Sequence, residues 1–162
     1  MDFSRLDRNR VLLGGISGGL LALSLLLPWY ALSDTPERVE QGSWLCGEGE
    51  FSCTAWETFP ILRWLLLLAA LSPLILAYIL VRGHKLSWAP GEMTMVAGFS
   101  ALVLIAYNGL LDIPAPEQGL EFETTIKYGY FVALLASAGI AATGFLRSQA
   151  GQKRTRKAPG TV

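Results

Sequence analysis

Apolar residues along this chain fall into four long blocks rather than into periodic stripes. Each block has about the 20 residues that an α-helix needs to cross a hydrocarbon layer roughly 30 Å thick. Polar connections separate the blocks. The pattern therefore predicts four transmembrane helices, at residues 11–30, 61–81, 93–111 and 125–146.

This pattern predicts an all-α membrane protein, with a four-helix transmembrane bundle over residues 1–147 and outside loops at residues 31–60 and 112–124. Apolar residues make up 52% of the chain and charged residues only 16%, which is lean for a soluble surface. The remaining segment, 148–162, is polar, basic and poor in apolar residues, so we expect a disordered tail. We interpret its charge as an orientation signal rather than a lipid-binding patch.

The positive charges lie mostly on one side of the four blocks. Only Arg38, Arg63 and Lys127 lie on the other side, where acidic residues gather. The basic residues of the first side are Arg5, Arg8, Arg10, Arg82, Lys85, Arg147, Lys153, Arg154, Arg156 and Lys157. Because cytoplasmic segments carry an excess of Lys and Arg, we expect both termini in the cytoplasm and the helices in the plasma or inner membrane. The formal net charge is zero, and nothing indicates a nucleic acid partner.

The first block has an alternative interpretation as a cleaved signal peptide, because Arg8 and Arg10 precede it. However, the block is long enough to span a bilayer, and it ends in Pro28, Trp29 and Tyr30. Aromatic residues at that position are typical of an interfacial anchor rather than of a small-residue cleavage site. We therefore expect the first helix to be retained. Cleavage would leave an odd number of crossings.

Cys46 and Cys53 are the only cysteines and lie in the first outside loop, an oxidising location in which we expect a structural disulfide. Gly47 and Gly49 between them permit a turn, so residues 41–57 are a candidate short β-hairpin that the disulfide would close. The alternative is a thiol-oxidising membrane enzyme. Such enzymes use a Cys-x-x-Cys pair and a second cysteine pair, and this chain has neither, which argues against that alternative.

The first block carries two overlapping small-xxx-small pairs on one helical face. Such faces let two helix backbones approach closely and gain van der Waals contact. We predict a helix-packing face there. Its partner is either another helix of this chain or a second protein. The face consists of Gly14, Gly15, Gly18 and Gly19.

Four polar residues are expected near the outer mouth of the bundle, namely Arg63, Asn108, Asp112 and Lys127. Charges near a membrane span are candidates for a functional site. The alternative is that these side chains reach water or pair with loop acids, which would make them structural. His84 stands without metal-ligand spacing, and no catalytic triad or phosphate loop is visible. We therefore predict no catalytic residues, no cofactor and no metal.

Two stretches carry a resemblance to a known group. Leu27-Pro28-Trp29-Tyr30, followed by Ala55-Trp56-Glu57-Thr58-Phe59, resembles a group of small uncharacterised four-helix membrane proteins of the actinobacterial type. That resemblance covers the first two helices and implies topology, not an activity.

A second, weaker likeness is to claudin-type tetraspan proteins. It is carried by Trp29, Gly42-Ser43-Trp44, Cys46 and Cys53 in the first outside loop. Ser43 stands where that family has leucine, and the gap between the cysteines is short, so we interpret this likeness as convergence.

The sequence predicts a non-enzymatic integral membrane protein. The expected role is that of a structural or accessory subunit that contacts other membrane proteins or itself through the outside loop and the glycine face. The alternative is a small transporter or lipid-binding membrane protein with its site at the outer mouth of the bundle.

Overall fold

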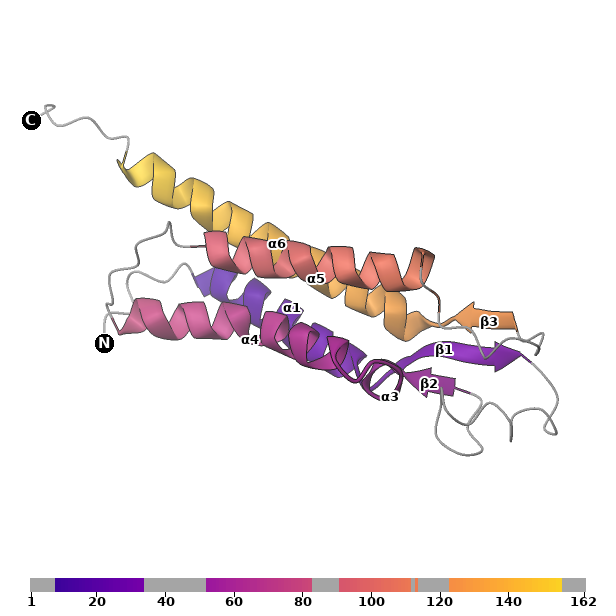
Figure 1. Ribbon diagram of the computed structural model, residues 1–162. Coiled ribbons are helices and arrows are strands. Elements are labelled where there is room, and N and C mark those ends of the chain that lie inside the picture. Colours follow the sequence, from indigo (N-terminus) through magenta and orange to yellow (C-terminus); the bar gives the residue numbers. More distant parts are fainter. Residues whose placement is uncertain (1–7, 34–51, 83–90, 112, 114–122, 156–162) are drawn as a thin grey trace, which may run out of the picture.

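The computed structural model describes residues 8–33, 52–82, 91–111, 113 and 123–155. Four long helices lie alongside one another, and three short strands gather at one end of them (Figure 1). The helices are α1 (Arg8–Ser24), α3 (Ala55–Thr58), α4 (Leu62–Val81), α5 (Glu92–Leu110) and α6 (Tyr128–Thr155). The strands are β1 (Pro28–Ser33), β2 (Ser52–Thr54) and β3 (Glu123–Ile126).

Three helices among the described residues, not four, are long and apolar enough to cross a membrane. They are Leu62–Val81, Glu92–Leu110 and Tyr128–Ala150. α1 has 17 residues, which at about 1.5 Å per residue makes a helix of roughly 25 Å. That length is at the lower limit of spanning helices, which have about 17–25 residues. The helical class is confirmed, and candidate membrane-spanning helices are confirmed for the last three of the four predicted blocks.

The first helix ends at Ser24, so its predicted extent to residue 30 is wrong. The Ser24 hydroxyl donates to the carbonyl of Leu21 at 2.6 Å, and the Trp29 indole N–H donates to the carbonyl of Ser24 at 2.8 Å. The Ser24 carbonyl also accepts from the Leu27 N–H at 3.1 Å, so carbonyls of the last turn have partners where the helix ends. Pro28, which has no N–H to continue a helix, opens β1 instead. An apolar run was therefore mistaken for a continuous helix.

The strands form one sheet in the order β2-β1-β3, with β1 antiparallel to both neighbours. Tyr30 lies opposite Cys53 on one side and opposite Ile126 on the other. The sheet thus joins segments from both predicted outside loops. β2 falls within the hairpin predicted at residues 41–57, but its partner is β1, and residues 34–51 lie outside the described part of the chain.

The last helix begins later and ends later than predicted. Residues 125–126, expected to open it, belong to β3, and α6 begins at Tyr128. At its other end α6 continues to Thr155, so the expectation of a disordered tail is wrong for residues 148–155. Gln, Ala, Lys and Arg in that stretch are good helix formers. Residues 156–162 lie outside the described residues.

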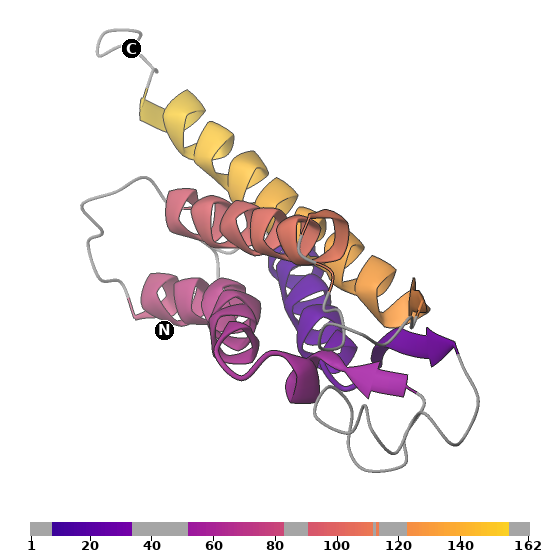
Figure 2. The same ribbon diagram turned by 45° about the vertical axis from the view of Figure 1, so that its right-hand side comes forward.

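The four long helices pack unequally. α6 lies along both α5 and α1, α4 packs on α1, and α4 and α5 share a smaller contact. Figures 1 and 2 both show α6 running beside α5. Glycines permit these close approaches, because a Cβ on Gly98 would lie 2.4 Å from the Ala141 nitrogen, and one on Gly18 would lie 2.3 Å from the Ala70 carbonyl oxygen.

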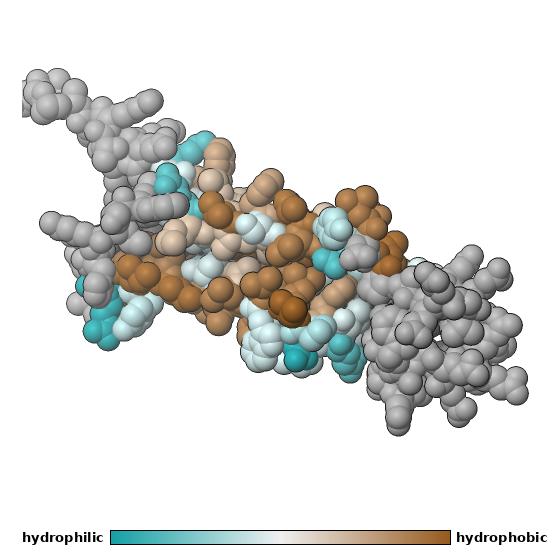
Figure 3. All heavy atoms as spheres, viewed as in Figure 1, coloured by the Kyte–Doolittle hydropathy of each residue, from teal (hydrophilic) through white to brown (hydrophobic). Residues whose placement is uncertain are grey.

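The helices present apolar side chains outward over most of their length (Figure 3). Leu68 on α4, Phe99 on α5 and Leu135 on α6 are all more than half exposed. A soluble protein rarely exposes so large an apolar surface, whereas lipid-facing helices do. The surface therefore agrees with helices that cross a bilayer.

Candidate functional site

A groove runs between α4 and α5, which share less contact than α5 shares with α6. Its volume is about 360 Å³. The lining extends from Leu65 to Ile79 along α4 and from Met93 to Leu104 along α5, so the groove follows both helices lengthwise. We call it the α4–α5 groove.

The floor and the rim of the α4–α5 groove differ in burial. Side chains on the floor are buried, and those on the rim are exposed. The floor residues are Ala69, Leu76, Thr94 and Ala101. The rim includes Leu65, Leu68, Ile75, Met93 and Ser100. Small residues on the α5 side leave the space unfilled, while leucine and isoleucine on α4 make one wall apolar.

The hydroxyl of Thr94 stands out on this floor. Thr94 is only 2% exposed, and its Oγ1 has no hydrogen-bond partner. The buried hydroxyl of Tyr130 on α6 also has no partner. Two serine hydroxyls of the bundle behave differently. Those of Ser72 and Ser137 each donate to the carbonyl three residues earlier, at 2.8 and 2.9 Å. Because buried polar groups are nearly always hydrogen-bonded, Thr94 is an exception that calls for a partner.

The structure does not assemble the predicted outer-mouth cluster. Asn108 uses its amide within α5, donating to the carbonyl of Leu104 at 2.8 Å, and the backbone N–H of Lys127 donates to the carbonyl of Trp29 at 2.7 Å. Across the described part of the chain, no hydrogen bond or ion pair joins Arg63, Asn108 and Lys127. Asp112, the fourth member, lies outside the described residues.

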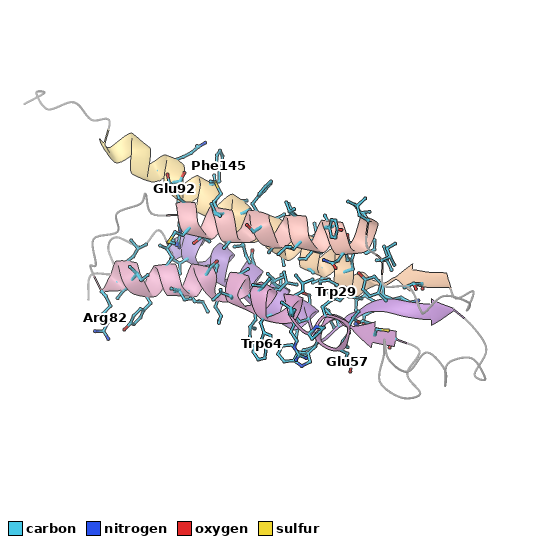
Figure 4. All side chains as sticks on the ribbon, in the orientation of Figure 1. Trp29, Glu57, Trp64, Arg82, Glu92 and Phe145 are labelled. Carbon is cyan, nitrogen blue, oxygen red and sulfur yellow. The ribbon has the colours of Figure 1, made fainter. Side chains whose placement is uncertain are left out.

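Arg63 instead packs among aromatic rings where α3 meets α4. Its Nη1 donates to the Trp56 carbonyl at 3.0 Å, and its Cζ lies 5.0 Å from the Trp56 ring and 5.7 Å from the Trp64 ring. Trp64 projects from α4 near its sheet end (Figure 4). A guanidinium over indole faces gains cation–π energy. The geometry therefore gives Arg63 a structural contact that ties α3 to α4.

We expect Arg63→Lys to destabilise this junction by roughly 1 kcal/mol, because lysine keeps the charge but loses the planar stacking group. The measurement is the thermal unfolding midpoint in detergent, followed by tryptophan fluorescence. Arg82→Lys is the matched control, since Arg82 stacks on the single ring of Tyr78 and is exposed. Equal shifts for both variants would contradict the structural role of Arg63.

The predicted glycine face of α1 splits into two parts. A Cβ on Gly14 would meet Pro73 at 3.1 Å, and one on Gly18 would meet Ala70, so these two glycines pack on α4. A Cβ on Gly15 would barely touch Leu74, at 4.0 Å, and one on Gly19 would meet no atom within 4 Å. One small-xxx-small pair is thus used inside the chain, and the other is left uncovered by the described residues.

Cys53 lies at the centre of β2, fully buried, and does not carry a free thiol. Its expected partner, Cys46, lies outside the described residues, so the pairing stays a prediction. The strand leads directly into α3 through a capping box. In it, the Thr54 hydroxyl accepts from the Glu57 N–H, and the Glu57 carboxylate accepts from the Thr54 N–H.

No protein-family model, curated protein or solved structure matches this chain. The two resemblances seen in the sequence therefore stay predictions. Among the described residues, no three His, Cys, Asp or Glu side chains gather as they would around a metal ion. His84 lies outside them. What the fold defines is a class: a mostly helical protein whose described residues include three helices long and apolar enough to cross a membrane.

Proposed function

We propose that this protein is a non-enzymatic, multi-pass membrane protein that serves as a structural or accessory subunit. In this proposal α1 contacts a transmembrane helix of another membrane protein. The observation that carries it is the second pair of the glycine face, in which Gly19 is exposed with no neighbour and Gly15 only touches Leu74 of α4.

The physical basis is close backbone approach. Between helices in lipid there is no hydrophobic driving force, so association depends on van der Waals packing, to which small residues give access. Around Gly15 and Gly19, the exposed side chains of Leu12, Ile16 and Leu23 follow the same helical stripe. A glycine groove flanked by large apolar side chains offers a partner helix both depth and contact area.

The proposal includes α1 as a fourth membrane crossing. It places the protein in the plasma or inner membrane, with both termini in the cytoplasm. Its support is that α1 begins and α6 ends at the end of the bundle opposite the sheet (Figure 1). Arg10 on α1 donates to the carbonyl of Leu146 on α6 at 2.9 Å, which aligns these two helix ends. A Cys46–Cys53 disulfide in the outside loop belongs to the same proposal.

Gly19→Leu is expected to lower crosslinking to a partner about tenfold or more, the equivalent of a loss of roughly 1.4 kcal/mol in binding. The fold should persist, because no neighbouring atom lies within 4 Å of the new Cβ. The measurement is photo-crosslinking from position 23 in intact membranes, followed by mass spectrometry of the captured chains.

Ala142→Leu serves as the matched control, since Ala142 is an exposed small residue on α6. It should leave the crosslinks unchanged. A wild-type protein that is captured with no partner would refute the accessory role. So would a Gly19→Leu variant with undiminished crosslinks.

A second candidate function is lipid binding, and the α4–α5 groove is the observation that favours it. Lipid binding is also the alternative that the sequence predicts, but there the site is the outer mouth of the bundle, and here it is the α4–α5 groove. The transporter interpretation rests on the outer-mouth residues, whose fourth member Asp112 lies outside the described residues, and it stays a prediction.

A further inference from the structure

We infer that the α4–α5 groove holds one acyl chain of a membrane glycerophospholipid, and that the Thr94 hydroxyl donates a hydrogen bond to the ester carbonyl of that chain. The inference does not depend on the accessory role of α1. It rests on the size of the groove, on its apolar walls and on the unpaired hydroxyl at one end.

The size of the groove suits a single chain. From Leu65 to Ile79 the groove follows α4 for about 21 Å, at roughly 1.5 Å per residue. Its volume is about 360 Å³ over that length. A long, narrow groove with an exposed rim admits an unbranched hydrocarbon chain, which enters sideways from the bilayer.

The walls are suited to such a chain. Leu68 and Ile75 form the α4 rim, and Ala97 and Ala101 leave room on α5. Atoms that border an empty space lose dispersion contacts on that side. A flexible chain from the surrounding bilayer restores those contacts along the whole groove.

Thr94 determines which kind of chain is held. It is the third residue of α5, so its hydroxyl lies within one turn of the helix end, near the level of the membrane interface. In a glycerophospholipid the ester carbonyl lies between the polar headgroup and the hydrocarbon, at that same level. The carbonyl supplies an acceptor for a donor that has no partner among the described residues. Because the hydroxyl oxygen is fully buried while the groove is empty, binding in this inference turns the Thr94 side chain about its Cα–Cβ bond toward the lipid. A hydrocarbon without a polar end would leave the hydroxyl unpaired.

The first test compares ester-linked with ether-linked phosphatidylcholine of the same chain length, in vesicles that contain the full-length protein. We expect the wild type to unfold at a higher temperature in the ester lipid, because the ether lacks the carbonyl. In Thr94→Val the difference between the two lipids should vanish. Valine has nearly the shape of threonine, so in lipid-free detergent the unfolding temperature of this variant should equal or exceed that of the wild type.

Equal unfolding temperatures of the wild type in both lipids would overturn the inference. So would a difference that persists in Thr94→Val. Both results can be interpreted whether or not α1 binds a partner, because the vesicles contain only this protein and one lipid.

The second test locates the chain with a phosphatidylcholine that carries a diazirine at the middle of one acyl chain. Labelling should concentrate on α4 and α5, and Ala97→Phe, which fills the groove, should reduce it about tenfold, or roughly 1.4 kcal/mol. Ala142→Phe on exposed α6 is the matched control. Ser100→Phe, on the exposed rim, repeats the test if Ala97→Phe does not fold. Even labelling of all helices, or labelling that neither variant reduces, would overturn the inference.

Discussion

Gly98→Leu is expected to prevent formation of the native bundle. A Cβ at this position would lie 2.4 Å from the nitrogen and 2.9 Å from the Cα of Ala141, and 2.9 Å from the carbonyl carbon of Ile140. All three are backbone atoms, which cannot rotate away, so α5 and α6 would have to separate. Overpacking of a core costs about 1–3 kcal/mol and occasionally more. Because two helix backbones collide here, we expect the upper end of that range or beyond.

The measurement is the yield of monodisperse protein after detergent extraction, with the thermal unfolding midpoint of whatever remains. Gly19→Leu is the matched control, because it makes the same substitution on another helix at a glycine with no neighbour within 4 Å. It should keep the wild-type midpoint. If Gly98→Leu and Gly19→Leu behaved alike, the close contact of α5 with α6 would be disproved.

The close contact of α5 with α6 shows which features the sequence could predict and which it could not. Long apolar blocks located the last three long helices, because the bilayer sets the length of a spanning helix whatever surrounds it. The ends agree to within a few residues except at the C-terminus of α6, which continues from the predicted residue 146 to Thr155. The small residues of the first helix indicated close packing. They did not show which glycine packs on which helix. Gly14 and Gly19 look alike in the sequence, and only the position of α4 separates them.

The sheet was missed because its pairing is nonlocal. Thr124, Thr125 and Ile126 are β-branched, which was a signal for a strand, but their partner β1 lies more than 90 residues earlier along the chain. The Thr125 hydroxyl donates to the carbonyl of Ala31 at 3.1 Å, a contact that no local pattern contains. Hydropathy alone therefore placed residues 28–30 and 125–126 in helices.

The α4–α5 groove could not be predicted for a related reason. Each of the two helices is apolar on all sides, so no face of either one marks a site. The groove exists because Gly98 and Gly144 draw α5 toward α6 and leave it less closely packed on α4. Thr94 is one of several hydroxyls in the helices, and only the structure shows that its partner is missing.

The second large effect is expected from Trp29→Ala. Trp29 is fully buried where α1, the sheet and α6 meet, and Figure 4 shows it at that end of the bundle. Its ring makes edge contacts with Phe59 at 6.2 Å and Tyr130 at 5.9 Å between centroids. Its indole N–H donates to the Ser24 carbonyl at 2.8 Å. Removal of a buried tryptophan costs about 3–5 kcal/mol, and the lost indole hydrogen bond is part of that cost, although the Ser24 carbonyl still accepts from the Leu27 N–H.

Chemical unfolding in detergent, followed by circular dichroism, measures this loss. Trp64→Ala is the control, because Trp64 is 56% exposed and contacts only neighbours at the same helix end, so its cost should stay within about 1 kcal/mol. Trp29→Phe separates the two contributions. It keeps an aromatic ring among Phe59 and Tyr130 and loses only the indole hydrogen bond, because the Ser24 carbonyl still accepts from the Leu27 N–H, so it should cost about 0.5–1.5 kcal/mol. If Trp29→Ala cost no more than Trp64→Ala, the aromatic contacts at Trp29 would not be what joins the sheet to the helices.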